Sequence, residues 1–213
     1  NETEALRYFK MSAEKGQIDG MYNYALMLKE SKNDPEKMKE ACNYFHSAAD
    51  KGHVDSMYNY ANMNENGIGT KMNKEIALKY YKEASNKGHV ESMYNYGNMI
   101  YKGEGTKMNK KEAIQYFKNA ADQGHVDSMI KYSKMRRKGD GIPEDSEESA
   151  TYLQMAIDLG STAAMIEYGK IISQKEMNTE MNLESLKFCK MAADNGDVQA
   201  MLKYASILKN GEG

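Results

Sequence analysis

Three histidines recur at intervals of 36 residues and pose the question of a metal site. His53 opens the phrase HVDSMYNYANM, His89 opens HVESMYNYGNM, and His125 opens HVDSMIKYSKM. A zinc ion needs ligand atoms that converge to about 2 Å. Equivalent positions in successive helix pairs are instead separated by two packed helices, each about 8–10 Å from the next. Since other copies carry Ser161 and Asp197 at this position, we expect a helix cap and no metal site.

The cysteines and the serine–lysine pairs do not predict catalysis either. Cys42 and Cys189 stand about four repeats apart, at positions that are apolar in other copies, so we expect buried, inert thiols and no disulfide. Ser12-Ala13-Glu14-Lys15 and Ser206-Ile207-Leu208-Lys209 match the Ser-x-x-Lys pattern of serine acylases. Ser12, however, replaces an alanine that all other copies keep and must face the packed helix pair, while Ser206 belongs to a polar face. We expect no catalytic residue, no cofactor and no enzyme activity.

Two glycine-rich stretches look superficially like phosphate-binding loops. They read Gly67-Ile68-Gly69-Thr70-Lys71 and Gly103-Glu104-Gly105-Thr106-Lys107. A P-loop needs Gly-x-x-x-x-Gly-Lys-Ser/Thr between a strand and a helix. Because the spacing differs and no strand is expected, we interpret both stretches as turns.

The whole chain follows the period of 36 residues. A glycine serves as the anchor of each copy, at Gly16, Gly52, Gly88, Gly124, Gly160 and Gly196. An aromatic residue stands eight positions before it, a small residue four before, a methionine five after and a tyrosine eight after. Six copies with the same residue types at the same spacings indicate a repeat protein whose units must stack to bury their apolar faces.

Each copy predicts two helices. Apolar or small residues fall 11, 8, 7, 4 and 3 positions before the anchor glycine, and bulky ones 5, 8, 11 and 12 after it, which is helical spacing. Asn1, Asn109 and Asp145 each precede a glutamate by three positions, a capping-box pattern. The anchor glycine is expected to end the first helix with a positive φ. A Gly-x-Gly turn follows the second helix in three copies.

The pattern Ala-x-x-Tyr-Phe/Tyr-x-x-Ala-Ala-x-x-Gly-x-x-x-Ser/Ala-x-x-x-Tyr-Gly/Ala, followed by Gly-x-Gly, resembles the SEL-one-like repeats (SLR), which are relatives of the tetratricopeptide repeats. It is clearest at Ala77–Gly105 and Ala113–Gly141. The resemblance implies an all-α fold, a right-handed α/α superhelix (solenoid) of six helix-turn-helix units. We expect one solenoid domain over 1–213, with units at about 1–33, 34–69, 70–105, 106–141, 142–177 and 178–213.

The two ends suggest a fragment of a longer polypeptide. The chain begins at an expected N-cap position and stops in the inter-repeat turn Gly211-Glu212-Gly213. Solenoids normally finish with a polar capping helix. We therefore expect an uncapped C-terminal edge that exposes Met201, Tyr204 and Leu208 and allows self-association.

Composition narrows the possible partners. The net charge is −2, with 40% hydrophobic and 28% charged residues, so no bulk charge favours nucleic acid or an anionic membrane. No apolar run reaches the roughly 18 residues of a membrane helix, and the first residues do not form a signal peptide. With only two cysteines, a cytoplasmic protein is expected.

Polar columns on the first helices predict the binding surface. In related superhelices these helices line the concave face. The columns nine and six positions before the anchor glycine are mostly basic or amidic: Arg7, Lys10, Asn43, His46, Lys79, Lys82, Gln115, Lys118, Thr151, Gln154, Lys187 and Lys190. We predict that ten of them, all except Thr151 and Gln154, bind the partner. An acidic column two before the anchor runs beside them. These stripes suit an extended peptide, although pairs such as Lys10–Glu14, Lys118–Asp122 and Lys190–Asp194 also occur on any solvated helix. The second helices are expected to form a polar convex face that exposes Asn23, Asn59 and Asn95.

The resemblance implies a protein–protein interaction scaffold, or adaptor, that binds a protein segment along the concave groove. A regulatory repeat region of a larger signalling protein, such as a kinase, is the alternative. A hydrolase of the cysteine-rich repeat type would need paired cysteines, and an RNA-binding helical repeat would need a basic groove. The sequence has no paired cysteines, and its balanced net charge of −2 together with the acidic column beside the basic one argues against RNA binding.

Overall fold

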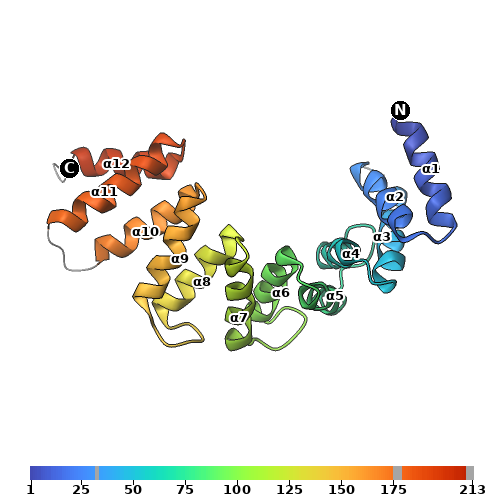
Figure 1. Cartoon of the computed structure of the whole chain (residues 1–213), viewed down its shortest axis with the longest axis horizontal. Helices are drawn as coiled ribbons and strands as arrows, with labels where there is room; N and C mark the ends of the chain where they lie inside the picture. Colours follow the sequence, from blue (N-terminus) through green and yellow to red (C-terminus); the bar gives the residue numbers. More distant parts are fainter. Residues whose placement is uncertain (32–33, 175–178, 210–213) are drawn as a thin grey trace. The chain divides into compact units, whose positions relative to one another are not determined.

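The computed structural model describes residues 1–31, 34–174 and 179–209, with the side chains at 170–185, 203 and 207 also left undescribed. Within these residues the chain forms twelve α-helices and no β-strand (Figure 1), which confirms the all-α prediction. The helices are α1 (Glu2–Glu14), α2 (Ile18–Glu30), α3 (Pro35–Asp50), α4 (Val54–Asn66), α5 (Lys74–Asn86), α6 (Val90–Lys102), α7 (Lys110–Asp122), α8 (Val126–Lys138), α9 (Ser146–Asp158), α10 (Thr162–Gln174), α11 (Thr179–Asp194) and α12 (Val198–Lys209). The terminal turn at 210–213 lies outside the described residues.

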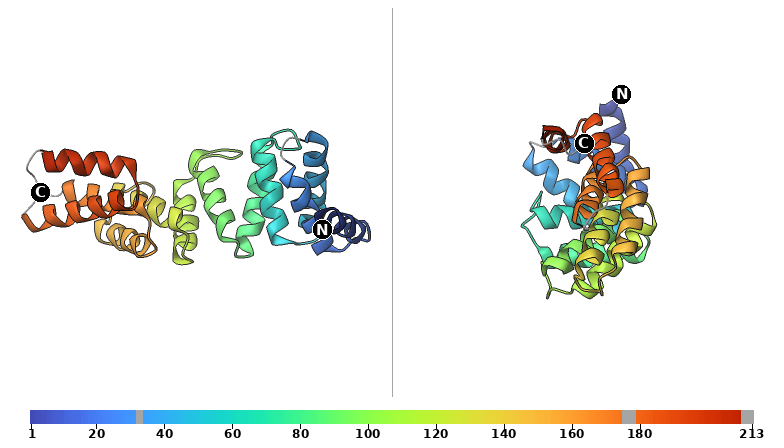
Figure 2. Two further views of the ribbon diagram at one scale, coloured as in Figure 1. Left: turned by 90° about the horizontal axis from the view of Figure 1, so that it is seen from above. Right: turned by 90° about the vertical axis from the view of Figure 1, so that its left-hand side faces the viewer.

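The helices belong to two compact units, residues 1–116 and 117–213, each of which is described by itself. In the first unit, each helix from α1 to α6 packs against the next one along the chain. Figures 1 and 2 show this side-by-side order. In the second unit the same order holds from α8 to α12. Odd-numbered helices are the first helices of the repeats and even-numbered helices are the second.

The repeated histidines cap the second helices, as predicted. The Nδ1 atoms of His53, His89 and His125 accept hydrogen bonds from the third backbone N–H that follows, at 3.1–3.2 Å. Capping of first helices is confirmed at Asn109 and Asp145, whose side chains accept from backbone N–H groups. Asn1 is the N-cap residue of α1 as predicted, but the capping hydrogen bond is wrong there, since its side chain makes no such bond.

The glycines fulfil two different backbone requirements. All six anchor glycines have φ between 83° and 92°, the left-handed conformation that ends a first helix. Gly105, the second glycine of a Gly-x-Gly turn, has φ 71° and lies against the start of α5. A Cβ there would come within 2.6 Å of the Lys74 carbonyl oxygen. The turn therefore needs glycine for close approach as well as for φ.

Small and bulky columns meet in the core as their spacing predicts. The alanines four positions before the anchor are fully buried at Ala48, Ala84, Ala120, Ala156 and Ala192. Ser12 takes the equivalent place in α1 and packs on Gly20 of α2, where any Cβ would lie 2.4 Å from its Oγ. The serine thus faces the helix pair, and Ser206 is exposed.

Both cysteine predictions and one asparagine prediction can be compared with the structure. Cys42 and Cys189 are free and buried, and burial raises the pKa of the Cys42 thiol to about 11. Asn59 is buried instead of exposed, because Lys29 of the preceding pair donates to its Oδ1 at 2.8 Å. Asn23 and Asn95 are half-buried. The described helices include none that is long and apolar enough to cross a membrane.

Candidate interaction surface

Successive repeats meet through pairs of tyrosines. In each pair, the tyrosine of a second helix contacts the edge or face of one from the next first helix. Such tilted pairs are the favoured aromatic geometry. Ring centroids lie 4.6–5.0 Å apart in Tyr24–Tyr44, Tyr60–Tyr80, Tyr96–Tyr116 and Tyr132–Tyr152. We call each pair, with its polar neighbours, a junction cluster.

In the Lys82 cluster, a lysine of one repeat and a glutamate of the next share a tyrosine. Lys82 Nζ lies 3.9 Å from Glu112 Oε1 and 5.5 Å from the ring centroid of Tyr96. The Tyr96 hydroxyl donates to the same carboxylate oxygen at 2.9 Å. The Lys82 ammonium is therefore held by a carboxylate and an aromatic ring, while the side chain keeps 51% of its surface exposed.

The Lys10 cluster repeats this geometry. Lys10 Nζ lies 3.9 Å from Glu40 Oε1 and 5.9 Å from the Tyr24 ring centroid, and Tyr24 donates to Glu40 at 3.0 Å. Burial and the hydrogen bond to the carboxylate raise the pKa of Tyr24 well above its ordinary value. The hydroxyl therefore stays protonated as the donor.

The Lys118 cluster of the second unit adds one contact. Lys118 Nζ lies 4.0 Å from Glu148 and donates to the Tyr152 hydroxyl at 2.6 Å. That hydroxyl in turn donates to Asp122. The hydrogen bond to Tyr152, together with the Asp122 charge, raises the pKa of Lys118 above its ordinary value.

In the His46 cluster, an imidazole stands at the position of the lysine in the other clusters. His46 stacks on Tyr60 with ring centroids 4.4 Å apart and lies 3.3 Å from Asp50, which accepts a hydrogen bond from Tyr80 at 2.6 Å. The residue at the glutamate position of this cluster is Ile76. This cluster therefore has the tyrosine pair but neither the lysine nor the glutamate of the other clusters.

All ten residues of the predicted partner surface are exposed or half-buried. Arg7, Lys10, Asn43, Lys79, Lys82, Gln115, Lys187 and Lys190 are exposed, and His46 and Lys118 are half-buried. Of the three predicted i,i+4 pairs, only Lys118–Asp122 is formed in the described residues, at 3.4 Å. Lys10 pairs with Glu40 of the next repeat instead of Glu14.

Sequence reasoning did not place any glutamate in these clusters, and it interpreted Glu112 and Glu148 only as capping-box residues. Glu40, Glu112 and Glu148 each stand twelve positions before an anchor glycine, so the same column analysis could have found them. It also missed Arg136, which donates to the Asp145 carboxylate at 2.9 Å and bonds Glu148. Arg136 has no equivalent in neighbouring repeats, and so no periodic signal marked it.

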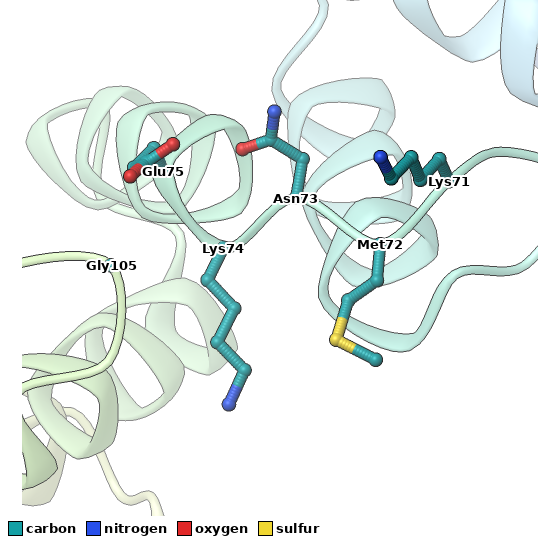
Figure 3. A pocket seen from close by; sticks show the side chains of 6 residues that line it. All are labelled: Lys71, Met72, Asn73, Lys74, Glu75 and Gly105. Carbon is teal, nitrogen blue, oxygen red and sulfur yellow. The ribbon is translucent and has the colours of Figure 1, made fainter.

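A hollow lies away from the clusters, at the inter-repeat loops of the first unit. It has a volume of about 400 Å³ and is lined by Lys71, Met72, Asn73, Lys74, Glu75 and Gly105. In Figure 3 the side chains of Met72 and Lys74 extend to the same side of the loop. Lys74 forms an ion pair with Glu104, the residue before Gly105, at 2.9 Å.

Comparison with known families identifies the repeat. The Sel1 repeat family matches residues 1–17, 18–53, 54–89, 90–125 and 126–161. Each of the four full-length matches, from residue 18 to 161, combines the second helix of one pair with the first helix of the next and so contains one junction of the kind described above. The chain belongs to the Sel1 repeat family, as the resemblance implied.

Solved structures with the same fold include three bacterial proteins. A protective antigen of uropathogenic Escherichia coli with an SLR fold matches at TM-score 0.85 and 22% identity, over 95% of this chain and 43% of its own. A Sel1 repeat protein from Oxalobacter formigenes matches at TM-score 0.73 and 23% identity, over 88% of this chain and 75% of its own. An immunity protein from Pseudomonas aeruginosa matches at TM-score 0.51 and 22% identity, over 86% and 68%.

These matches establish the fold and no specific binding role. This chain spans less than half the length of the Escherichia coli antigen. No curated protein sequence matches it significantly.

Proposed function

We propose that the chain is a protein–protein interaction scaffold and that it binds an extended segment of a partner protein across the first helices. The observation that carries the proposal is the repeated cation of the junction clusters. Lys10 and Lys82 are about half exposed, and each is held in place by a tyrosine and a glutamate of its neighbourhood. Similar cations therefore stand at repeating positions on one set of helices.

Fixed cations suit a peptide ligand for an energetic reason. Ordering a free lysine side chain costs about 0.5–1.5 kcal/mol on binding. Where the ammonium is held over a tyrosine ring, the lysine side chain is already partly ordered before the ligand binds, so binding loses less of its conformational entropy. The neighbouring Lys79, with its side chain 63% exposed, and Asn43 add donors for the carboxylates or carbonyls of the partner.

We infer that these residues bind and do not catalyse. The titratable groups of each cluster bond one another, and the tyrosine hydroxyls donate to carboxylates, an arrangement that keeps them protonated. Such groups supply hydrogen bonds and charge, and we assign no reaction step to them.

Affinity capture from the native cell extract, read by mass spectrometry, tests the proposal. The variant Lys79→Glu/Lys82→Gln changes the charge of α5 without placing a second carboxylate against Glu112. Lys15→Glu/Lys87→Gln makes the same change of charge on the loops that join the two helices of a pair, away from both proposed surfaces, and serves as the control. Circular dichroism must show that both variants fold.

We expect one or more proteins retained by the wild-type chain and by the loop variant to be lost from the α5 variant. If the α5 variant retains all of them, the first-helix surface is not the binding site. If the wild-type chain captures no protein, the scaffold function itself is contradicted.

A further inference from the structure

The loops that follow α4 and α6 expose large apolar side chains. Residues 67–73 read GIGTKMN and residues 103–109 read GEGTKMN. Met72 is 57% exposed and Met108 is 62% exposed, and Ile68 beside them is 37% exposed. These loops therefore place two methionines in solvent at equivalent positions of consecutive repeats.

Backbone hydrogen bonds hold both loops in one conformation. The Asn73 N–H donates to the Asn64 carbonyl and the Asn109 N–H donates to the Ile100 carbonyl, each at 2.8 Å. Gly105 also packs directly on the first turn of α5. The methionines thus extend from turns that are fixed at both ends.

A third loop shows that the turn does not require these residues. In residues 139–145, the Asp140 N–H and the Asp145 N–H make the equivalent hydrogen bonds, at 2.9 and 3.0 Å, and Gly139 and Gly141 have positive φ. Pro143-Glu144 nevertheless occupies the positions of Lys71-Met72. The backbone of this turn therefore does not require methionine, and the side chain at this position can differ between repeats without loss of the turn.

The two methionine loops also differ from the third loop in charge. Residues 67–76 carry two lysines and one carboxylate, and the equivalent residues 103–112 carry three lysines and two carboxylates. The equivalent residues 139–148 carry five carboxylates and no basic residue. Lys71 and Lys107 are exposed and form no ion pair with any residue that the structure describes. The methionine loops therefore combine apolar surface with uncompensated positive charge.

We propose that Met72, Met108, Lys71 and Lys107, with the hollow between the two loops, form a second docking surface for an acidic protein segment that carries large apolar side chains. The partner's carboxylates would pair with the lysines, and one apolar side chain would enter the hollow against Met72. Methionine suits this task because its flexible thioether adapts to different apolar shapes.

A peptide fits this surface better than an anionic membrane does. The hollow of about 400 Å³ accepts a single side chain, and Glu75 in its lining offers a carboxylate to a peptide N–H. A polypeptide offers donors and acidic groups together, whereas a lipid surface offers mainly the latter.

Selection from a phage-displayed library of random dodecapeptides tests this surface. The wild-type chain is the target, and Met72→Glu/Met108→Glu is the counter-target, a substitution that reproduces Glu144 of the third loop. Leu159→Glu, at another exposed apolar residue (59% exposed), is the matched control. Fluorescence anisotropy of selected peptides then gives the dissociation constants.

We expect enriched peptides to contain acidic residues beside Leu, Ile, Met or Phe. Their affinity should fall by about tenfold or more in the double variant and stay within about twofold in Leu159→Glu. Failure to enrich any peptide, or enrichment of basic peptides or of peptides that bind the double variant equally, would overturn the inference.

Two further measurements test whether a membrane or a second copy of the chain occupies this surface instead of an acidic peptide. Co-sedimentation with phosphatidylserine/phosphatidylcholine vesicles that is lost in the double variant would assign the surface to a membrane instead. Sedimentation velocity that shows a self-complex of the wild-type chain, absent from the double variant, would assign it to a second copy of the chain. Either result would contradict the acidic peptide.

Discussion

Two junctions within the first unit solve the same packing problem with different chemistry. The Lys82 cluster joins Lys82 and Glu112 around Tyr96, whereas the His46 cluster stacks an imidazole on Tyr60 and has Ile76 at the glutamate position. Both keep a nearly perpendicular or tilted tyrosine pair, at 4.6 and 4.8 Å. The aromatic contact is therefore common to the junctions, and the ionic contact varies.

The physical reason is the relative size of the two contributions. A buried aromatic side chain contributes several kcal/mol through burial, whereas an exposed ion pair contributes about 0.2–1 kcal/mol. The lysine and glutamate positions can therefore change without loss of the fold. If the chain is the scaffold that we propose, this freedom makes these positions suitable for determining which partner binds.

Loss of the aromatic contact is expected to have the largest effect, and it should be similar in both junctions. Tyr80→Ala and Tyr96→Ala each remove a ring that is at most 5% exposed, so the free energy of unfolding should fall by about 3–5 kcal/mol. Urea unfolding followed by circular dichroism measures it. Tyr8, which is 56% exposed, occupies the position of Tyr80 in the first repeat. Tyr8→Ala is the control and should lower the free energy of unfolding by less than about 1 kcal/mol. A cost confined to one junction would contradict a shared aromatic contact.

The hydroxyl contact should have an intermediate effect that depends on pH. Burial and the hydrogen bond to Glu148 raise the pKa of Tyr132 to about 12, against an ordinary value of 10.0. The folded state thus keeps a proton that the unfolded state loses, so this stabilisation is complete below pH 10 and disappears between about pH 10 and 12. Tyr132→Phe should lower the free energy of unfolding by about 1 kcal/mol at neutral pH and flatten its decline in the alkaline range.

The control for this prediction is Tyr60→Phe. The Tyr60 hydroxyl bonds no carboxylate in the described part of the chain, so the neutral-pH cost should stay within about 0.5 kcal/mol. Urea unfolding at a series of pH values measures both variants. Equal costs at neutral pH for Tyr132→Phe and Tyr60→Phe would show that the carboxylate bond adds no stability.

Removal of the ionic contact should have the smallest effect. Lys82→Gln breaks a 3.9 Å pair whose two side chains are 51% and 35% exposed, so the free energy of unfolding should change by less than about 1 kcal/mol. Raising the salt concentration should reduce the difference further, because exposed pairs are screened. A double-mutant cycle with Glu112→Gln measures the pair by itself. A coupling above about 2 kcal/mol would place the ion pair on a level with the aromatic contact.

Much of the fold could be predicted from the sequence because the repeat provides several observations of each position. The glycine conformations and the histidine caps follow from local rules, since a left-handed C′ residue and an N-cap acceptor act within a few residues of themselves. The alanine columns follow from the helical period. Asn1 occupies the N-cap position but makes no side-chain hydrogen bond, although it matched the same rule, so a pattern alone does not make a hydrogen bond.

The candidate surface was only partly predictable. The basic column on the first helices was visible, but Lys10 was expected to pair within its own helix with Glu14. It pairs instead with Glu40 of the next repeat, because the packing of neighbouring pairs brings that carboxylate close. Asn59 was assigned to an exposed face for the same reason, since the lysine that covers it comes from another pair.

The sequence by itself therefore determined the helices, their caps and turns, and the residues that face the core, since each depends on neighbours within about a dozen residues. Only the tertiary structure decided which charges meet, which side chains share a tyrosine, and that Met72 and Met108 remain in solvent. Those outcomes depend on the distance between side chains of different repeats, and that distance is fixed by the stacking of the pairs.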